Sequence, residues 1–396
     1  MGRLGITRVL AAAVAVAVCV VLIGRPANAA IGSGSFTKAT HPGAGGSGPR
    51  DFWVYEPTTR PAGRRPLVVY LHGCTQTAPD AAIGTRWNEL AEAEGFVVAY
   101  PEQSVAANGA QCWNWFLPED QARGTGEPAV IAAITADVVA THDIDPTRVY
   151  VLGASAGADM AIILAATYPD VYAAVGAFAG CAYATCHDVE GTAAAGTMAD
   201  RARVVPALLV QGTADMLNDY GLGKTMERQA VATNDLVDDG QANGSVPGQP
   251  SSSEDHGFGA SALDGVGKPG DVCVRNRQFP CAAGALGLHE YPYTVDHHAT
   301  ADGCSVVDLV SVYGLNHDYP GGDPAGTFTD PVGPAATPMA WDFFRRQRLG
   351  VAPCHGLDGA GPPVVTELPG PVLAATAAAL GLGVITLRRG RRSLSP

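Results

Sequence analysis

Short apolar segments alternate with segments of helical periodicity along most of this chain, and that alternation limits the folds open to it. A strand that is apolar on both faces must be covered on both faces, as in a parallel sheet flanked by helices. We therefore predict an α/β fold with a mainly parallel sheet, helices on both faces, and ligands bound beyond the carboxyl ends of the strands. The expected strands are 67–71, 96–100, 148–152, 173–178, 207–210 and 308–313, and the expected helices are 87–94, 128–141, 158–168 and 222–232.

Two segments of different composition interrupt this pattern. Residues 30–50 are rich in Gly and Ser, so we expect a flexible entry there, followed by an edge strand at 51–56. Residues 235–301 are rich in Gly, Asp, Ser and Pro. We expect them to form a long irregular insertion before the last strand, held together by Cys273 and Cys281.

The sequence Gly153-Ala154-Ser155-Ala156-Gly157 lies between the expected strand 148–152 and the expected helix 158–168. This is a G-x-S-x-G motif in the strand-turn-helix context of the nucleophile elbow of α/β-hydrolases. The turn is too tight for side chains at the glycine positions, and it holds the serine in a strained, exposed conformation. We therefore predict an α/β-hydrolase fold with Ser155 as the nucleophile.

A nucleophilic serine needs a base, and the base needs an orienting acid, which follow the serine in this fold in the order acid, then histidine. Asp215 follows the expected strand 207–210, and His317 follows the expected strand 308–313. Both would lie at strand carboxyl ends, where Ser155 also lies. We expect the other candidates to be outside the site, with the histidines exposed in the insertion; these are His256, His289, His297, His298 and Asp219.

The tetrahedral oxyanion of an acyl-transfer reaction needs backbone N–H donors. One donor is expected from Ala156, directly after the nucleophile, and the other from the turn after the first central strand, where Cys74 is the first candidate and Thr75 the second. A disulfide between Cys74 and Cys112 would also fix this loop.

Several motifs follow one another along the chain: Leu71-His72-Gly73-Cys74-Thr75-Gln76, Tyr100-Pro101-Glu102-Gln103, Cys112-Trp113-Asn114-Trp115-Phe116, Gly126-Glu127-Pro128, Gly153 to Gly157, and His317 with Pro320-Gly321-Gly322. Their order resembles that of the extracellular poly(3-hydroxybutyrate) depolymerase family of esterases, which is related to feruloyl and acetylxylan esterases. The resemblance covers roughly residues 51–346 and implies an α/β-hydrolase fold with the roles of nucleophile, acid and base on Ser155, Asp215 and His317. The chain departs from the family at Asn316-His317-Asp318-Tyr319 and in its long insertion.

We therefore expect a serine esterase that needs no cofactor and acts on hydroxyalkanoate esters or a polyester. Trp113 and Trp115 are candidate substrate-binding residues, as an aromatic wall for an acyl chain, although they could equally be core residues. A feruloyl or acetylxylan esterase is the alternative within this chemistry. A binding protein on an inactive hydrolase scaffold and a membrane-bound acyltransferase are the alternatives outside it.

Charge and cysteine content limit the partners and the compartment. The chain carries a formal charge of −13, and seven arginines lie near its ends, so the middle is strongly acidic and nucleic acid is not an expected partner. Eight cysteines follow the first 29 residues, an even number that suggests disulfides in an oxidising compartment, with Cys181–Cys186 and Cys74–Cys112 as preferred pairs. No metal-ligand spacing occurs, and Asp235, Asp238 and Asp239 do not match a calcium loop.

The two ends have the composition of targeting segments. Residues 1–29 are typical of a secretory signal peptide, with basic residues, an apolar run and an Ala27-Asn28-Ala29 cleavage site. The catalytic domain would span 51–350, followed by a linker at 351–371. Residues 372–387 are uncharged and precede an arginine-rich tail at 388–396, which favours a C-terminal membrane anchor over sortase attachment or an amphipathic tail. We expect a secreted protein that this segment can hold at the cell surface.

Overall fold

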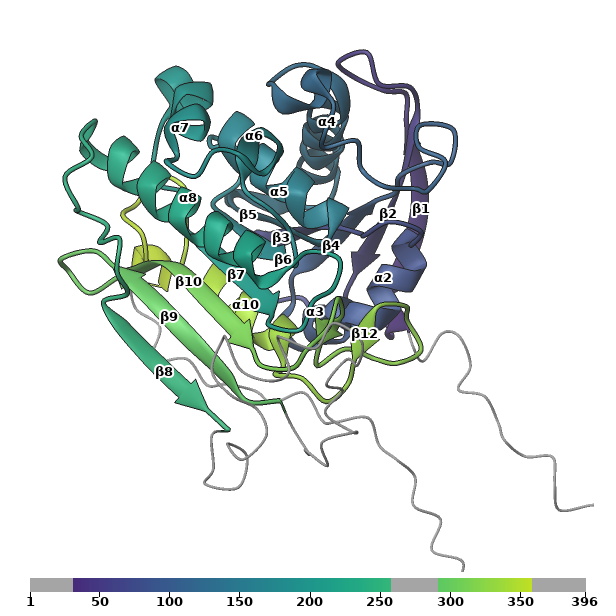
Figure 1. The fold of residues 1–396 in the computed structure, drawn as a ribbon. Helices are drawn as coiled ribbons and strands as arrows, with labels where there is room; N and C mark the ends of the chain where they lie inside the picture. The colour runs from purple at the N-terminus through teal and green to yellow at the C-terminus, as the bar shows by residue number, and fades with distance from the viewer. Residues whose placement is uncertain (1–30, 258–290, 358–396) are drawn as a thin grey trace, which may run out of the picture.

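The computed structural model describes residues 31–257 and 291–357. Ten strands form one sheet in the order β1-β2-β4-β3-β5-β6-β7-β10-β9-β8 (Figure 1). The strands are β1 (Ser35–His41), β2 (Arg50–Glu56), β3 (Arg65–Leu71), β4 (Val97–Pro101), β5 (Ile144–Ala154), β6 (Ala174–Phe178), β7 (Ala207–Gly212), β8 (Ser252–His256), β9 (Tyr293–Ala299) and β10 (Ser305–Val312). The six central strands from β4 to β10 are parallel, and both flanks are antiparallel. The predicted α/β-hydrolase fold with its mainly parallel sheet is confirmed.

Helices cover the two faces of the sheet and bury two apolar layers (Figure 1). One layer lies beneath α4 (Gly126–Thr141), α5 (Ala156–Thr167), α7 (Thr192–Met198) and α8 (Tyr220–Asp239). The other lies against α2 (Ala78–Thr85), α3 (Trp87–Glu94) and α10 (Ala336–Phe344). Short elements connect them: η1 (Pro118–Gln121), α6 (Tyr183–Cys186), η2 (Ala199–Arg201), β11 (Tyr319–Pro320), β12 (Thr329–Asp330) and η4 (His355–Leu357).

The central strand β3 shows why such a sequence must be buried on both faces. Leu67, Val69 and Leu71 belong to the first apolar layer, and Val68 and Tyr70 belong to the second. Successive side chains of a strand point to opposite faces. A strand without polar alternation is therefore stable only between two helical layers.

The edges of the sheet correct two expectations. Part of the expected flexible entry is a strand: β1 (Ser35–His41) pairs with β2 along its full length and makes β2 the second strand rather than the edge. Residues 235–301 are not uniformly irregular. Helix α8 continues to Asp239, and β8 and β9 extend the sheet in antiparallel register. Their pattern is hard to recognise because β8 carries no large apolar residue.

Three disulfides join described residues. Cys74–Cys112 and Cys181–Cys186 are formed as predicted, and Cys304–Cys354 ties the start of β10 to the segment after α10. Bridges of this kind persist in an oxidising environment, which agrees with the predicted export. The expected Cys273–Cys281 link lies outside the described residues.

Within the described ranges, no helix has the length and apolar character needed to cross a bilayer. The signal segment 1–29 and the proposed anchor 372–387 lie outside those ranges.

Candidate active site

Ser155 lies at the sharp turn between β5 and α5, with φ 55° and ψ −128°. That conformation is strained for a residue with a side chain. The flanking glycines make it possible: a Cβ on Gly153 would lie 2.4 Å from backbone atoms of Gly157, and a Cβ on Gly157 would lie 2.1 Å from the carbonyl oxygen of Leu71. The Ser155 amide donates to the Phe178 carbonyl at 2.9 Å. The elbow is thus held against the neighbouring strands β3 and β6.

The neighbouring strands β7 and β10 bring Asp215 and His317 together. The loops after these strands stay bonded to each other, with Ala214 N–H donating to the Leu315 carbonyl at 3.1 Å. Nδ1 of His317 lies 2.8 Å from Oδ2 of Asp215. A carboxylate can only accept, so Nδ1 carries the proton and Nε2 is left as the basic nitrogen.

The Asp215 carboxylate is fully buried and held by several donors. Its Oδ1 accepts from the amides of Leu217 and Asn218, both at 2.9 Å, and its Oδ2 also accepts from Gln211 Nε2 at 3.2 Å. These bonds fix the orientation of the carboxylate and, through it, the ring of His317.

Two backbone amides are available beside Ser155 as oxyanion donors. Ala156 is the first residue of α5, so its N–H has no acceptor within the helix. The Thr75 amide donates to the Ala110 carbonyl at 2.7 Å and is therefore engaged elsewhere, which leaves Cys74 as the candidate in this loop. The Cys74–Cys112 disulfide fastens the loop as expected.

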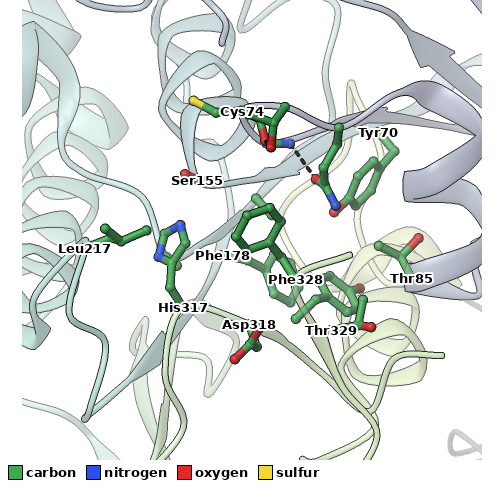
Figure 2. A pocket seen from close by; sticks show the side chains of 16 residues that line it. Tyr70, Cys74, Thr85, Ser155, Phe178, Leu217, His317, Asp318, Phe328 and Thr329 are labelled. Atoms are coloured by element: carbon green, nitrogen blue, oxygen red, sulfur yellow. Dashed lines mark hydrogen bonds between the residues drawn. The ribbon is translucent and has the colours of Figure 1, made fainter. Parts of the chain in front are cut away.

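These residues surround one mainly apolar pocket, shown in Figure 2. Ser155, Cys74 and His317 line it, and Figure 2 shows the ring of His317 below the hydroxyl of Ser155 on the same side of the pocket. Its remaining walls come from side chains that the sequence did not single out. Among them are Tyr70, Phe178, Leu217, Asp318, Tyr319 and Phe328.

Burial and charge act on Asp318, the residue after His317. Burial raises the pKa of its carboxyl group, and the charges of Asp330 and Asp215 raise it further, while the nearby His317 opposes them. Asp318 is one of the positions at which the chain departs from the family pattern, and it places an acidic side chain in the wall of the pocket.

The expected aromatic wall of Trp113 and Trp115 is wrong. Trp113 is completely buried in the core, where its Nε1–H donates to the His72 carbonyl at 3.1 Å. Trp115 packs at the edge of the same core against Phe116, and neither tryptophan lines the pocket. The pocket residues Phe178, Leu217 and Phe328 could have been proposed instead from their nearness to strand ends and catalytic candidates.

Two other histidines of the insertion, His297 and His298, have structural partners, and His289 lies outside the described residues. His298 is 1% exposed and bonds Glu227 at 3.0 Å and the Pro247 carbonyl at 2.8 Å. Burial lowers the pKa of His298, but the bonds to Glu227 and Pro247 outweigh it, so that the pKa is raised. His297 bonds Asp308 at 2.7 Å, which raises its pKa. Both lie on β9, so the expectation of exposed loop residues is wrong for them.

Among the aspartates considered as calcium ligands, Asp235 and Asp239 are occupied by local bonds. Asp235 accepts from the Gly244 and Val246 amides and from the Ser245 hydroxyl. No cluster of three or more metal-ligating side chains is found in residues 31–257 and 291–357.

The sheet order, the serine elbow and the adjacent histidine-carboxylate pair together define an α/β-hydrolase. Residues 51–234 match the family described as esterase PHB depolymerase. The matched segment includes Ser155 and Asp215 and ends before His317.

Two curated relatives match part of the chain. Poly(3-hydroxyalkanoate) depolymerase C of Paucimonas lemoignei is 42% identical over 164 residues, which is 41% of this chain and 39% of the relative. Feruloyl esterase B of Neurospora crassa is 37% identical over 145 residues, which is 35% of this chain and 47% of the relative. The chain thus spans less than half of the length of these relatives.

A solved structure extends the similarity at the level of the fold. The acetyl xylan esterase from Aspergillus awamori superimposes with a TM-score of 0.52 and 18% sequence identity, over 72% of this chain and 94% of that chain.

Proposed function

We propose that the protein is a serine esterase that hydrolyses hydroxyalkanoate esters, in the manner of a poly(3-hydroxybutyrate) depolymerase. The observation that carries the proposal is the pairing of His317 Nδ1 with buried Asp215, which leaves Nε2 as a base in the same pocket as Ser155. The assignment of the catalytic roles to these residues is part of the proposal.

In the first half of the reaction, the Ser155 hydroxyl attacks the ester carbonyl and gives its proton to Nε2 of His317. Asp215 stabilises the imidazolium that results. The negative charge that develops on the carbonyl oxygen accepts hydrogen bonds from the amides of Ala156 and Cys74. The tetrahedral intermediate then expels the alcohol, which takes the proton from His317 and leaves an acyl group on Ser155.

In the second half, water replaces the alcohol. His317 accepts a proton from water as its oxygen attacks the acyl group on Ser155, and returns that proton to the Ser155 oxygen as the acid leaves. The same two amides stabilise the second oxyanion. These steps require no metal ion and no organic cofactor.

Apolar side chains at the mouth of the pocket support an uncharged, extended ester as the substrate. Leu217 and Phe328 line the pocket and are 70% and 47% exposed, and Met216, next to Leu217 in the chain, is 59% exposed. Large apolar side chains exposed together mark binding surfaces more often than chance. A polyester chain or oligomer could lie across this rim with one ester bond at Ser155.

A feruloyl or acetylxylan esterase is the second candidate, supported by the similarity to feruloyl esterase B over 145 residues. The two candidates share the chemistry and differ in the group that the pocket accepts.

The test compares the full chain, secreted so that its disulfides form, with the variant S155A. Acid release is measured on a poly(3-hydroxybutyrate) suspension, soluble hydroxybutyrate oligomers, methyl ferulate and acetylated xylan. Hydroxybutyrate release by the unaltered protein alone supports the proposal, and preference for ferulate or acetylxylan supports the second candidate. Transfer to an added alcohol instead of water would identify an acyltransferase. No turnover together with no fluorophosphonate labelling of Ser155 would refute the hydrolase mechanism and leave a binding role.

Attachment of the enzyme to the cell surface through residues 372–387 is a separate proposal. It is tested by fractionating cells that express the chain with and without residues 358–396. Recovery of both forms in the medium would contradict it.

A further inference from the structure

The side chain of Gln76 connects two walls of the pocket that are far apart in the sequence. Its Oε1 accepts from the Gly73 amide at 2.8 Å. Its Nε2 donates to the Thr327 carbonyl at 2.9 Å and to Asp80 at 3.2 Å. Gly73 N–H can only donate and the Thr327 carbonyl can only accept, so the orientation of the amide group is fixed by its partners. Gln76 is itself 6% exposed and lines the pocket.

The first of these walls holds the candidate oxyanion donor. The N–H of Cys74 belongs to the peptide bond whose carbonyl is that of Gly73, and in a trans peptide these two groups point in opposite directions. The Gly73 carbonyl accepts from Nδ1–H of buried His72 at 2.8 Å. His72 thus fixes the carbonyl end of this peptide, and Gln76 fixes the preceding amide. A Cβ on Gly73 would lie 3.4 Å from Cβ of Ser155, which shows how closely the loop approaches the nucleophile.

The second wall is the segment 323–329, which carries Phe328. Asp80 accepts from both the amide and the hydroxyl of Thr327, and the Asp323 amide donates to the Gly84 carbonyl at 2.8 Å. These contacts fasten the segment to helix α2. Phe328, with φ 52°, then stands over the pocket with its ring centroid 6.4 Å from that of His317 (Figure 2).

We infer that Gln76 is a positioning residue that aligns the Cys74 oxyanion donor with the Phe328 wall. The inference rests on the proposed esterase function. Contact of the substrate with Phe328 and stabilisation of the oxyanion at Cys74 are linked through one amide group. Because Gln76 need not touch the reacting atoms, it acts through the two segments that it holds.

Two variants separate the two ends of this link. Q76M removes both the acceptor for Gly73 and the donor for Thr327. Q76E keeps an acceptor for Gly73 but removes the donor and brings a second carboxylate next to Asp80. Removing an oxyanion donor altogether costs about 10²–10³-fold in kcat, so loss of its alignment in Q76M is expected to lower kcat by about 10–100-fold. KM for a small acetate ester should stay within about threefold in the same variant, because ground-state binding does not use the oxyanion donors.

Q76E should instead affect the Phe328 wall. We expect kcat on the acetate ester to fall by less than about fivefold, while KM for a hydroxybutyrate oligomer that reaches Phe328 rises by about fivefold or more. The rate of fluorophosphonate labelling of Ser155 should fall in Q76M and be largely retained in Q76E.

Gln229 provides a matched control, since it is a buried glutamine on α8 whose Nε2 donates to Thr233 at 3.1 Å, away from the pocket. Q229M should leave kcat unchanged. If Q76M retains full kcat, or if Q76E and Q76M lose kcat equally, the inference is wrong. If Q76M does not fold, the split between kcat and KM in Q76E still decides. An unaltered protein with neither turnover nor labelling refutes the proposed function instead.

Discussion

The buried carboxyl group of Asp159 predicts a specific dependence of stability on pH. Asp159 lies on the first turn of α5, four residues after Ser155, and is 5% exposed. Its carboxylate accepts from the Cys181 amide at 2.7 Å. Burial raises the pKa of Asp159 from 3.8 to about 8, because desolvation of the charged form exceeds the opposing effect of that one bond. The folded protein therefore holds a proton on Asp159 that the unfolded chain has released.

The direction of the effect follows from this difference in bound protons. Between pH 4 and 8 the folded state binds about one more proton at this position, so the free energy of unfolding falls as the pH rises. The contribution is fully present below the unfolded pKa and is lost as the pH rises toward the folded pKa. One proton corresponds to about 1.4 kcal/mol per pH unit, or about 2.7 kcal/mol between pH 5 and pH 7.

The substitution D159N removes the titration but keeps an oxygen that can accept from the Cys181 amide. Urea unfolding is measured for D159N and for the unaltered protein at pH 5, 6 and 7. The free energy of unfolding of D159N, relative to that of the unaltered protein, should rise by about 1.4 kcal/mol per pH unit. Taking the difference removes the contributions of all other titrating groups. D200N, at a side chain that is 83% exposed, controls for the loss of a carboxyl group that titrates in the unfolded chain. A D159N difference that stays constant over this range would refute the reasoning.

Three further outcomes are expected. D215N should lower kcat by about 10³–10⁴-fold with little change in KM, measured on the best soluble ester, because the wrong tautomer of the base is then favoured; an unchanged kcat would remove Asp215 from the mechanism. Replacing both Cys304 and Cys354 by Ser should lower the free energy of unfolding by up to about 4 kcal/mol, because the disulfide closes a loop of 50 residues. Activity at low temperature should be retained, because the bridge lies at the amino end of β10, away from the pocket. W113F should lower the melting temperature without raising KM for any ester, since this ring is in the core; a selective rise in KM would restore its predicted role in substrate binding.

The central strands were predictable because nearly all of their residues are apolar, and such a segment must be buried on both faces. The expected strand 67–71 corresponds to β3 (Arg65–Leu71), and the expected strand 207–210 lies within β7 (Ala207–Gly212). Both are buried along their whole length. A short segment without polar residues has few alternatives to a central strand. The candidates Ser155, Asp215 and His317 were predictable for a related reason, since the carboxyl ends of these strands meet at one edge of the sheet.

The outer strands could not be predicted in the same way. Strand β8 (Ser252–His256) is almost entirely exposed, and its place in the sheet depends on pairing with β9 (Tyr293–Ala299). Such a strand is defined by backbone hydrogen bonds to a partner strand. These bonds do not require a regular alternation of apolar and polar side chains, so the sequence of the strand does not reveal it. The same holds for β1, whose Gly- and Ser-rich surroundings suggested a flexible segment.

The pocket walls were missed because sequence gives the type of a side chain but not its burial. Trp113 and Phe328 are both aromatic. Trp113 lies in a motif that matches the esterase family, and Phe328 follows the catalytic candidate His317 in the chain. Trp113 is fully buried, whereas Phe328 is 47% exposed. Phe328 has a positive φ, and its segment is bonded to α2 through Thr327 and Asp80, neither of which its sequence indicates.

Four residues that line this pocket have strained backbone conformations. Thr75, Ser155, Ala179 and Phe328 all line it and all have φ between 52° and 64°, although none is a glycine. Conformations of this kind cost about 1–3 kcal/mol each and persist only where surrounding structure imposes them. Hydrogen bonds impose it here: the amides of Ser155 and Ala179 donate to carbonyls of neighbouring strands at 2.9 Å, the Thr75 amide donates to a fixed loop at 2.7 Å, and the Phe328 carbonyl accepts from the Tyr319 amide at 2.8 Å. The sheet and its loops thus hold the nucleophile, the oxyanion loop and the pocket wall in orientations that the free chain would avoid. A site built in this way needs little rearrangement when substrate binds, which is the arrangement that electrostatic stabilisation of an oxyanion requires.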